Sequence, residues 1–179
     1  MSSISTVGHS SHPIEELLEI LRAHRVERVL DVRRFPASCK WPHFDAVSLA
    51  RSLSAAGLDY LGLPELGGRR KARSDSPHTA WRVEAFRGYA DFMDTPEFAA
   101  GLEKVMALSR EKPSTLLCAE ALPWRCHRSL IADALMARGF QVLEILSASE
   151  AKPRRFPTFA RVDGERVIYD GGELPFDGG

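Results

Sequence analysis

Several features that would assign this 179-residue sequence to a familiar class of protein are scarce or missing. Cysteine occurs only three times, at Cys39, Cys118 and Cys126, and this odd number does not fit the scaffold of a disulfide-rich secreted domain. No apolar stretch approaches the ~20 residues that a membrane helix requires. The first residues are polar and do not resemble a signal peptide. We therefore expect a cytoplasmic protein with reduced thiols and no membrane partner.

A surplus of charge is also missing. Lysine and arginine together number 24, as do aspartate and glutamate, so net charge predicts no polyanionic partner. The charge is nevertheless uneven, because six basic residues and only two acidic ones lie between Arg69 and Arg87. Such a run is typical of a solvated loop. Alternatively, the Arg69–Arg73 loop contacts nucleic acid, with Trp81 and Phe86 as stacking partners.

The hydrophobic residues, 44% of the chain, are enough for one core without disulfides or metals. Short apolar runs alternate with stretches of helical periodicity, which is the pattern of an α/β protein. We expect a single three-layer domain over residues 1–179, with a core over 3–147 and a tail over 148–179. The sheet should be mostly parallel, with about five strands, at residues 4–7, 28–32, 59–63, 114–117 and 140–146.

Two segments specify the topology further. The opening reads as strand, helix, strand, which favours a parallel sheet with a right-handed crossover. We expect the strands that contain Val29 and Ser114 to be neighbours or near neighbours in that sheet. In the tail, two short runs flank Asp163-Gly164, which predicts a β-hairpin over residues 161–169.

Polar residues follow the predicted strands and should meet at one edge of the sheet, because parallel strands end on the same side. His9 and Ser10 follow the first strand, Asp31 and Arg33 lie around the end of the second, and Cys118 and Glu120 come at the fourth. A helical pattern then begins at Arg125, Cys126, His127 and Arg128. This concentration of thiols, carboxylates, imidazoles and guanidinium groups indicates a site.

Each candidate catalytic residue has a structural alternative. Cys118 is either a nucleophile or a small buried hydrophobic residue. Glu120 is either a general acid or base, or a partner for free N–H groups of its own turn. His127 either carries protons, as His9 would, or has a structural role in which it caps the helix start or hydrogen-bonds an aspartate. Asp31 should pair with an arginine or a histidine, since buried charges are paired.

The ligand is expected to be a small anion. A helix N-terminus at Cys126–Arg128 would offer N–H groups, and Arg33, Arg125 and Arg128 would hold phosphate oxygens. Asp31, Ser10 and Cys126 complete the predicted ligand-binding set. Zinc is a weaker alternative, because the Cys118-x₇-Cys126-His127 spacing, even with Cys39 added, lacks the close ligand pairs of structural zinc sites. We expect no metal ion and no cofactor.

A larger set of segments carries a resemblance over almost the whole chain. The sequence resembles the bacterial and archaeal proteins of domain-of-unknown-function family 488. This resemblance implies a single α/β domain and a shared polar site, but no reaction. The segments that carry it are Thr6–Ser10, Asp31–Arg33, Leu63–Gly68, Phe86–Ala90, Cys118–Glu120 and Cys126–Arg128.

A second resemblance is partial. The order of Asp31-Val32-Arg33, Cys118, Arg128-Ser129 and Gly139-Phe140 is similar to that of rhodanese domains. Rhodanese domains, however, have four residues between their cysteine and arginine, whereas nine separate Cys118 from Arg128 here. A tight persulfide-binding loop is therefore not implied.

Two function hypotheses follow. The first is a thiol- or carboxylate-dependent hydrolase or transferase that acts on a phosphate-bearing or nucleotide-like anion. The second is a non-catalytic module that binds a nucleotide or nucleic acid. The sequence leaves the substrate and the oligomeric state open.

Overall fold

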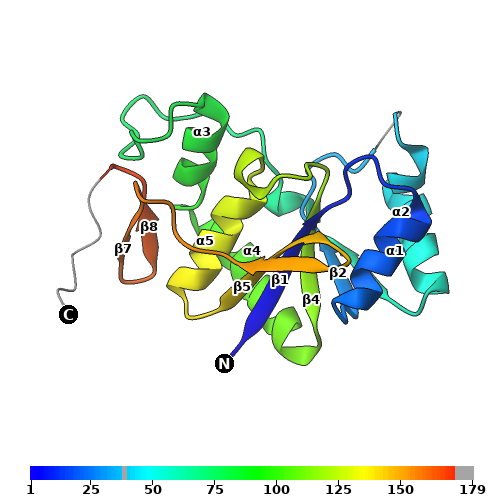
Figure 1. Cartoon of the computed structure of the whole chain (residues 1–179). Coiled ribbons are helices and arrows are strands. Elements are labelled where there is room, and N and C mark those ends of the chain that lie inside the picture. Colours follow the sequence, from blue (N-terminus) through cyan, green and yellow to red (C-terminus); the bar gives the residue numbers. More distant parts are fainter. Residues whose placement is uncertain (38–39, 172–179) are drawn as a thin grey trace.

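The computed structural model describes residues 1–37 and 40–171, and Cys39 lies outside them. A six-stranded sheet runs through the molecule in the order β3-β2-β4-β1-β5-β6 (Figure 1). Its strands are β1 (Ser3–Gly8), β2 (Arg28–Asp31), β3 (Asp59–Gly62), β4 (Ser114–Cys118), β5 (Gln141–Ser147) and β6 (Glu150–Pro153). The helices are α1 (Ile14–Ala23), α2 (Ala46–Ala55), α3 (Glu84–Phe92), α4 (Pro96–Glu111) and α5 (Arg128–Ala137).

The first five strands are parallel, as predicted. β2 pairs directly with β4, with Val29 opposite Thr115, which confirms that the strands containing Val29 and Ser114 are neighbours. β4 and β1 lie at the centre of the sheet, and every residue of β4 is buried. The chain therefore places Cys118, the last residue of β4, in the most enclosed part of the sheet edge.

The sixth strand, β6, pairs antiparallel with β5 and was not predicted. Its sequence, Glu150-Ala151-Lys152-Pro153, is short, charged and closed by a proline. Edge strands commonly have these properties, because they prevent pairing with another chain. The same properties explain why the strand was not predicted, since it lacks the apolar run by which the other strands were recognised.

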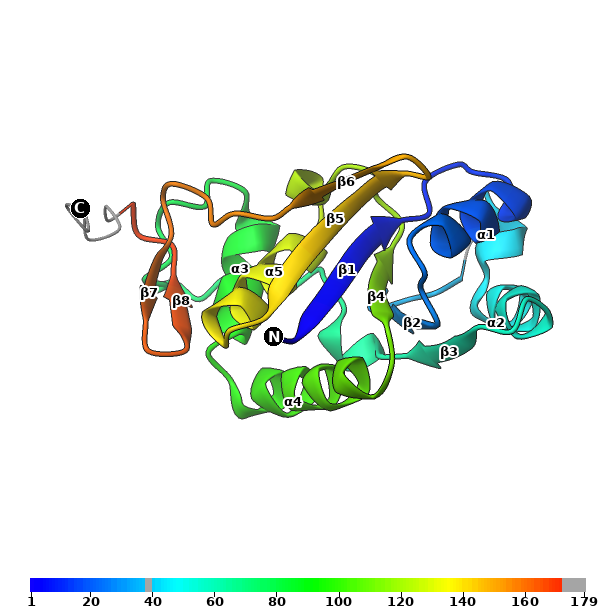
Figure 2. The ribbon, with the colours of Figure 1, turned by 60° about the horizontal axis from the view of Figure 1, so that its bottom comes forward.

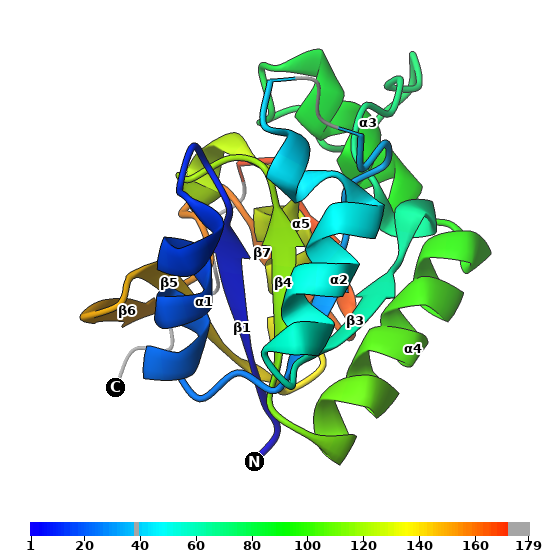
Figure 3. The same cartoon turned by 90° about the vertical axis from the view of Figure 1, so that its right-hand side faces the viewer.

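The helices cover both faces of the sheet, giving three layers (Figure 3). On one face, Leu17 and Leu21 of α1 and Leu49 and Leu53 of α2 are fully buried in one apolar cluster. On the other face, α3, α4 and α5 enclose a larger cluster that includes Leu30, Leu116 and Leu130 as well as both described cysteines. The site thiols thus belong to the α5 side of the sheet.

Local signals place the helix ends. Thr95 caps α4, because its Oγ1 accepts a hydrogen bond of 3.3 Å from the N–H of Phe98. Asp45 occupies the equivalent position before α2, but its side chain makes no capping bond. α2 is followed by Gly57 with φ +78° and α5 by Gly139 with φ +89°, a left-handed conformation that suits glycine. Within the part of the chain that the structure describes, none of these helices has the length and apolarity needed to cross a membrane.

The C-terminal segment forms the predicted hairpin from β7 (Arg161–Asp163) and β8 (Arg166–Ile168), which lies beside α5 (Figure 2). A buried polar network fixes it there. The hydroxyl of Tyr169 donates to Asp133 of α5 at 2.7 Å, and Arg154 donates to Asp133 at 2.8 Å and to Glu144 of β5 at 2.7 Å. Arg154 is thus the cation between two carboxylates, and it connects the segment after β6 to the sheet and α5.

Replacing Arg154 with methionine should destabilise the protein strongly. The Asp133 side chain is fully buried and that of Glu144 is 15% exposed, so both would lose their cation in a poorly solvated place. Breaking a buried ion pair costs about 3–5 kcal/mol. The free energy of unfolding, measured with urea, should fall by that amount. Arg155→Met is the matched control, because Arg155 is exposed; an equal loss in both variants would contradict this role of Arg154.

Candidate functional site

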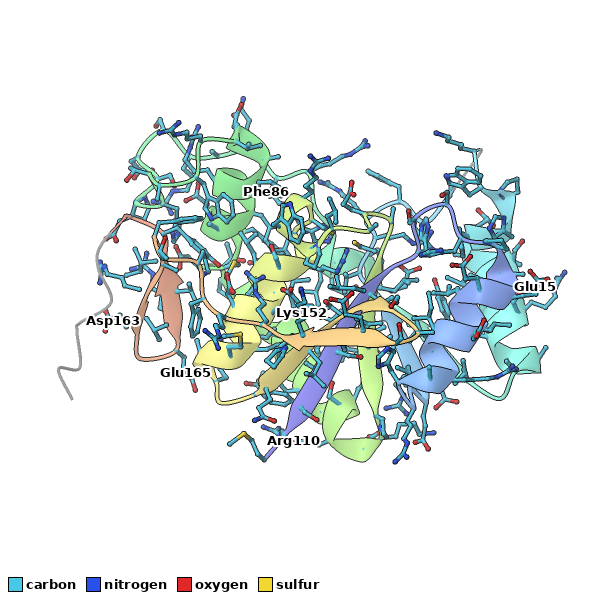
Figure 4. All side chains as sticks on the ribbon, viewed as in Figure 1. Glu15, Phe86, Arg110, Lys152, Asp163 and Glu165 are labelled. Carbon is cyan, nitrogen blue, oxygen red and sulfur yellow. The ribbon has the colours of Figure 1, made fainter. Side chains whose placement is uncertain are left out.

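A cleft of about 630 Å³ opens at the carboxyl ends of the parallel strands. Both described cysteines lie at its base, and segments that follow β2, β4 and β3 contribute its walls. Phe86 of α3, labelled in Figure 4, adds an aromatic ring. The ionisable residues that line the cleft are Arg33, Arg34, Arg69, Glu120, Arg125, Cys118, Cys126 and His127.

A slightly larger hollow, of about 710 Å³, lies between α4, α5 and the hairpin. Its arginines are already paired, Arg166 with Asp94 at 2.8 Å and Arg138 with Glu165 at 3.7 Å. Its lining, taken from the described residues, includes neither cysteine nor histidine. We therefore assign the chemistry to the smaller cleft.

The loop after β4 is held by the end of β1. The N–H groups of His9 and Ser10 donate at 2.9 Å to the carbonyl oxygens of Cys118 and Ala119. Gly8 allows this approach, because a Cβ atom there would lie 1.8 Å from the carbonyl oxygen of Glu120. The glycine therefore fixes the path of the backbone that presents Cys118.

The sulfur of Cys118 is in close contact with two donor groups. Cys126, which follows the short helix η3 (Pro123–Arg125), donates from its Sγ to Cys118 Sγ at 2.6 Å. Arg128, the first residue of α5, donates from its Nη1 to the same sulfur, also at 2.6 Å. Both partners favour the ionised form of Cys118, since donors to a sulfur stabilise a thiolate.

Arg128 is the electrostatic centre of the site. Its side chain is 0% exposed. Besides Cys118, its guanidinium donates to the carbonyl oxygens of Glu120 and, at 3.2 Å, of Ala121. No carboxylate of the described residues is among these partners. A guanidinium group remains charged in proteins, and buried charges are paired, so Cys118 is the group that can supply the counter-charge.

The pKa values of the two thiols are shifted in opposite directions. Burial opposes ionisation of Cys118, but the hydrogen bond from Cys126 and the charge of Arg128 together lower the pKa of Cys118 to about 7. For Cys126 the shift is opposite: its hydrogen bond to Cys118, and then burial, raise the pKa of its thiol well above the ordinary value. The pair therefore shares one proton, which stays on Cys126.

His127 faces Cys126 rather than Cys118. Its Nε2 lies 2.9 Å from the carbonyl oxygen of Val32, so this nitrogen carries the proton, and Nδ1 is left as an acceptor 3.6 Å from Cys126 Sγ. Gly68 permits this position, because a Cβ there would lie 2.9 Å from Nδ1. Burial lowers the pKa of His127, so the ring is neutral at neutral pH.

Asp31 and Arg33 form a second buried pair behind the cleft. The Asp31 carboxylate accepts from Arg33 at 2.6 and 2.8 Å and from the hydroxyl of Tyr60 at 2.6 Å. The prediction that Asp31 pairs with an arginine or a histidine is thus confirmed. His9 is stacked on Phe44 with ring centroids 4.1 Å apart, and burial lowers its pKa to about 4.

The predicted site residues therefore separate into two groups. The first group, which lines the cleft, consists of Cys118, Glu120, Arg33, Arg125, Cys126 and His127. The described lining does not include His9, Ser10, Asp31 or Arg128. His9, Asp31 and Arg128 are buried, whereas Ser10 is half-buried in the turn after β1 with φ 49°.

Two expectations about the start of α5, its free N–H groups and the ligand-binding role of Arg128, need correction. Cys126, which follows η3, is only 6% exposed. The N–H of Cys126 donates to Pro123, and that of Arg128 lies 3.5 Å from Cys126 Sγ, so neither points to the cleft. Arg128 lies beneath Cys118 and contacts the thiol, not the space where a ligand would lie.

Other cleft residues were missed from the sequence. Arg34 and Phe35, which is 67% exposed, extend from the loop after β2. A search confined to strand ends finds Arg33 but gives no reason to select its neighbours. Outside the cleft, Tyr60 was also missed, because its bond to Asp31 depends on β3 lying next to β2.

The predicted nucleic-acid loop makes internal contacts instead of a free basic surface. Arg70 stacks over Phe92 at 3.7 Å and donates to Glu65, and Arg73 pairs with Asp75 at 3.0 Å. Trp81 packs against Phe86, Phe159 and Tyr169 with ring centroids 5.0–5.5 Å apart. Arg69 is exposed and belongs to the cleft.

Metal ligation has little geometric basis here. Over residues 1–37 and 40–171, no three histidine, cysteine, aspartate or glutamate side chains are grouped as metal ligands would be. The Cys39 ligand considered for zinc falls outside these ranges. Cys118, Cys126 and His127 are joined by hydrogen bonds in a row instead of facing a common centre.

The fold and the cleft define an α/β protein whose site is built on a buried thiol pair and an arginine. Residues 13–135 match the family model described as Domain of unknown function DUF488, so the chain belongs to this family. No curated protein and no solved structure gives a significant match. The partial likeness to rhodanese domains therefore gains no support from relatives.

Replacing Asp31 with asparagine should destabilise the fold, because the buried Arg33 guanidinium would lose its anion. The expected loss is about 3–5 kcal/mol in the free energy of unfolding by urea. Asp59→Asn is the control: Asp59 forms pairs with Arg28 and Lys112 on the surface and should change stability little. Asp31→Asn with wild-type stability would show that Arg33 does not need the pair.

Proposed function

We propose that the protein is a cytoplasmic thiol-dependent transferase or hydrolase that acts on a small phosphate-bearing or nucleotide-like anion, with Cys118 as the nucleophile. The observation that carries this proposal is the pair of short hydrogen bonds to Cys118 Sγ, from the buried Arg128 and from Cys126. Because Arg128 needs a counter-charge, a thiolate at neutral pH is favoured in the folded protein. Such a thiolate is the reactive form in covalent catalysis.

The charges around the cleft support an anionic substrate. Arg34, Arg69 and Arg125 line it and are exposed, whereas Glu120 is the one carboxylate of its described lining. Arg33 also lines the cleft, but its guanidinium is already occupied by Asp31. The rim arginines can therefore bind phosphate oxygens, for which the guanidinium group is well suited.

The aromatic rings of the cleft support a substrate with a flat apolar part. Phe35 and Phe86 line the same space as the arginines. An aromatic face can stack on a nucleobase, while the guanidinium groups hold a phosphate. This combination favours a nucleotide-like molecule over inorganic phosphate.

Proton transfer in this proposal falls to Glu120, whose exposed side chain lines the cleft. His9 is less suited, because it is 3% exposed and burial lowers its pKa to about 4. A group with a pKa this low is a poor base at neutral pH.

The competing hypothesis is a binding module that uses the same cleft without catalysis. It explains the arginines and aromatic rings but gives no role to the ionised thiol. A nucleic-acid partner has less support, since the half-buried Trp81 packs against Tyr169, and Arg70 and Arg73 bind within their own loop.

The test combines ligand protection with turnover. AMP should slow iodoacetamide labelling of Cys118, measured by peptide mass spectrometry, and adenosine at the same concentration should not. Arg125→Gln should weaken AMP protection about tenfold, the effect of losing one charged hydrogen bond; Arg155→Gln is the control. Equal protection by AMP and adenosine would contradict recognition of an anion.

Turnover separates the enzyme from the binding module. With a panel of nucleoside phosphates, Cys118→Ser should abolish phosphate release in protein that circular dichroism shows to be folded, although less stable, and Cys39→Ser should behave like the wild type. Full turnover by Cys118→Ser together with its loss in Glu120→Gln would make the chemistry carboxylate-driven. If no panel member is turned over although AMP protects Cys118, the binding module is the correct description.

A further inference from the structure

We infer that Cys118 and Cys126 form a two-cysteine redox centre that reduces hydroperoxides, with Cys126 as the resolving cysteine and His127 as its base. The inference rests on three contacts: Cys118 Sγ to Cys126 Sγ at 2.6 Å, Cys126 Sγ to His127 Nδ1 at 3.6 Å, and Cys118 Sγ to Arg128 Nη1 at 2.6 Å. This activity needs the Cys118 thiolate but not the anionic substrate of the proposed function.

The arrangement gives the two cysteines different roles. Cys118 carries the negative charge, because Arg128 lies against it, and Cys126 keeps its proton. A thiolate attacks, and a neighbouring thiol then completes a disulfide. Both sulfurs and His127 line the cleft, which is the route by which a small peroxide would reach the nearly buried Cys118.

In the first step the Cys118 thiolate attacks one oxygen of a hydroperoxide. An S–O bond forms and the O–O bond breaks, which leaves a sulfenic acid on Cys118. The leaving alkoxide or hydroxide takes a proton from water. Cys118 is thereby oxidised by two electrons, and the peroxide is reduced to an alcohol or to water.

In the second step His127 Nδ1 takes the proton from Cys126, and the resulting thiolate attacks Cys118 Sγ. The S–S bond forms while the S–O bond breaks. The leaving hydroxide takes the proton back from the His127 imidazolium and becomes water. His127 is suited to this step, because Val32 fixes the proton on Nε2 and so leaves Nδ1 able to accept.

The buried arginine makes this disulfide easy to reduce. Disulfide formation removes the negative charge from Cys118, and Arg128 has no carboxylate among its described partners to replace it. The reduced state, which retains the thiolate, is therefore stabilised relative to the oxidised one. A disulfide with a stabilised reduced form is oxidising and labile, as catalytic disulfides are. An external dithiol can thus regenerate the site.

The closing experiment treats the reduced full-length protein with one equivalent of hydrogen peroxide and maps the products by peptide mass spectrometry without reduction. The expected product is a Cys118–Cys126 disulfide in the monomer, in both the wild type and Cys39→Ser. Dithiothreitol should reverse it and support catalytic loss of peroxide. A disulfide that involves Cys39, or oxidation of Cys118 to sulfinic acid without a disulfide, would overturn the inference.

Two variants test the assigned roles. Cys126→Ser should accumulate the Cys118 sulfenic acid, trapped as its dimedone adduct, and should form no intramolecular disulfide. His127→Gln, which retains a donor for Val32 but has no base, should slow disulfide formation about 10²-fold. Disulfide formation at the wild-type rate in His127→Gln would remove His127 from the mechanism.

This experiment is independent of the proposed function. Peroxide-dependent disulfide formation with no effect of AMP on Cys118 labelling would support the redox centre alone. AMP protection and turnover with no disulfide would support the anion-dependent enzyme and overturn the redox centre.

Discussion

The contact between the Arg128 guanidinium and the Cys118 sulfur is the interaction on which the site depends. It joins the end of β4 to the start of α5, and it is formed with Arg128 wholly buried. A guanidinium without an anion in the interior would be strongly unfavourable. The other partners of Arg128 are carbonyl oxygens of the intervening loop, which orient the group but do not neutralise it. The Cys118 thiolate would therefore be the counter-charge of a buried arginine as well as the nucleophile of the proposed function, and this dual role accounts for a cysteine at the end of a central strand.

The neighbouring side chains keep the negative charge on Cys118. Cys126 donates to Cys118 and retains the shared proton, and His127 accepts on the far side of Cys126, so a row of side chains leads from Arg128 to Val32. A separate hydrogen-bonded network consists of Asp31, Arg33 and Tyr60. Because Asp31 neutralises the charge of Arg33, Arg33 does not compete with Arg128 for the thiolate. The remaining arginines lie at the exposed rim, where they can hold a ligand. In the proposed function, the buried Arg128 stabilises the thiolate and the exposed arginines of the rim bind the substrate.

The sequence was sufficient for the parallel sheet, because its strands are short apolar runs, and for the hairpin around Asp163-Gly164. It also placed six of its candidate residues in the lining of the cleft, since residues at the ends of parallel strands converge. It could not show that Arg128 points inward beneath Cys118. These two residues are ten positions apart, and their contact depends on the path of the loop between them, which contains η3. Tyr60 and Phe35 were missed for a related reason: their contacts depend on strand order and loop conformation. β6 was missed because a charged edge strand lacks the apolar pattern.

Titration of the thiols tests the central claim most directly. The ultraviolet absorbance of thiolate, followed against pH in the folded protein, should show a transition near pH 7, where the lowered pKa of Cys118 places it. Because a thiol ionises as pH rises through its pKa, the thiolate should be present above this pH and lost below it. The transition should be absent in Cys118→Ser and retained in Cys39→Ser, and Cys126→Ala should move it to higher pH by removing the donor to Cys118. The account would be contradicted if no thiol ionised below the ordinary cysteine range, about pH 8.5, or if the early transition survived in Cys118→Ser.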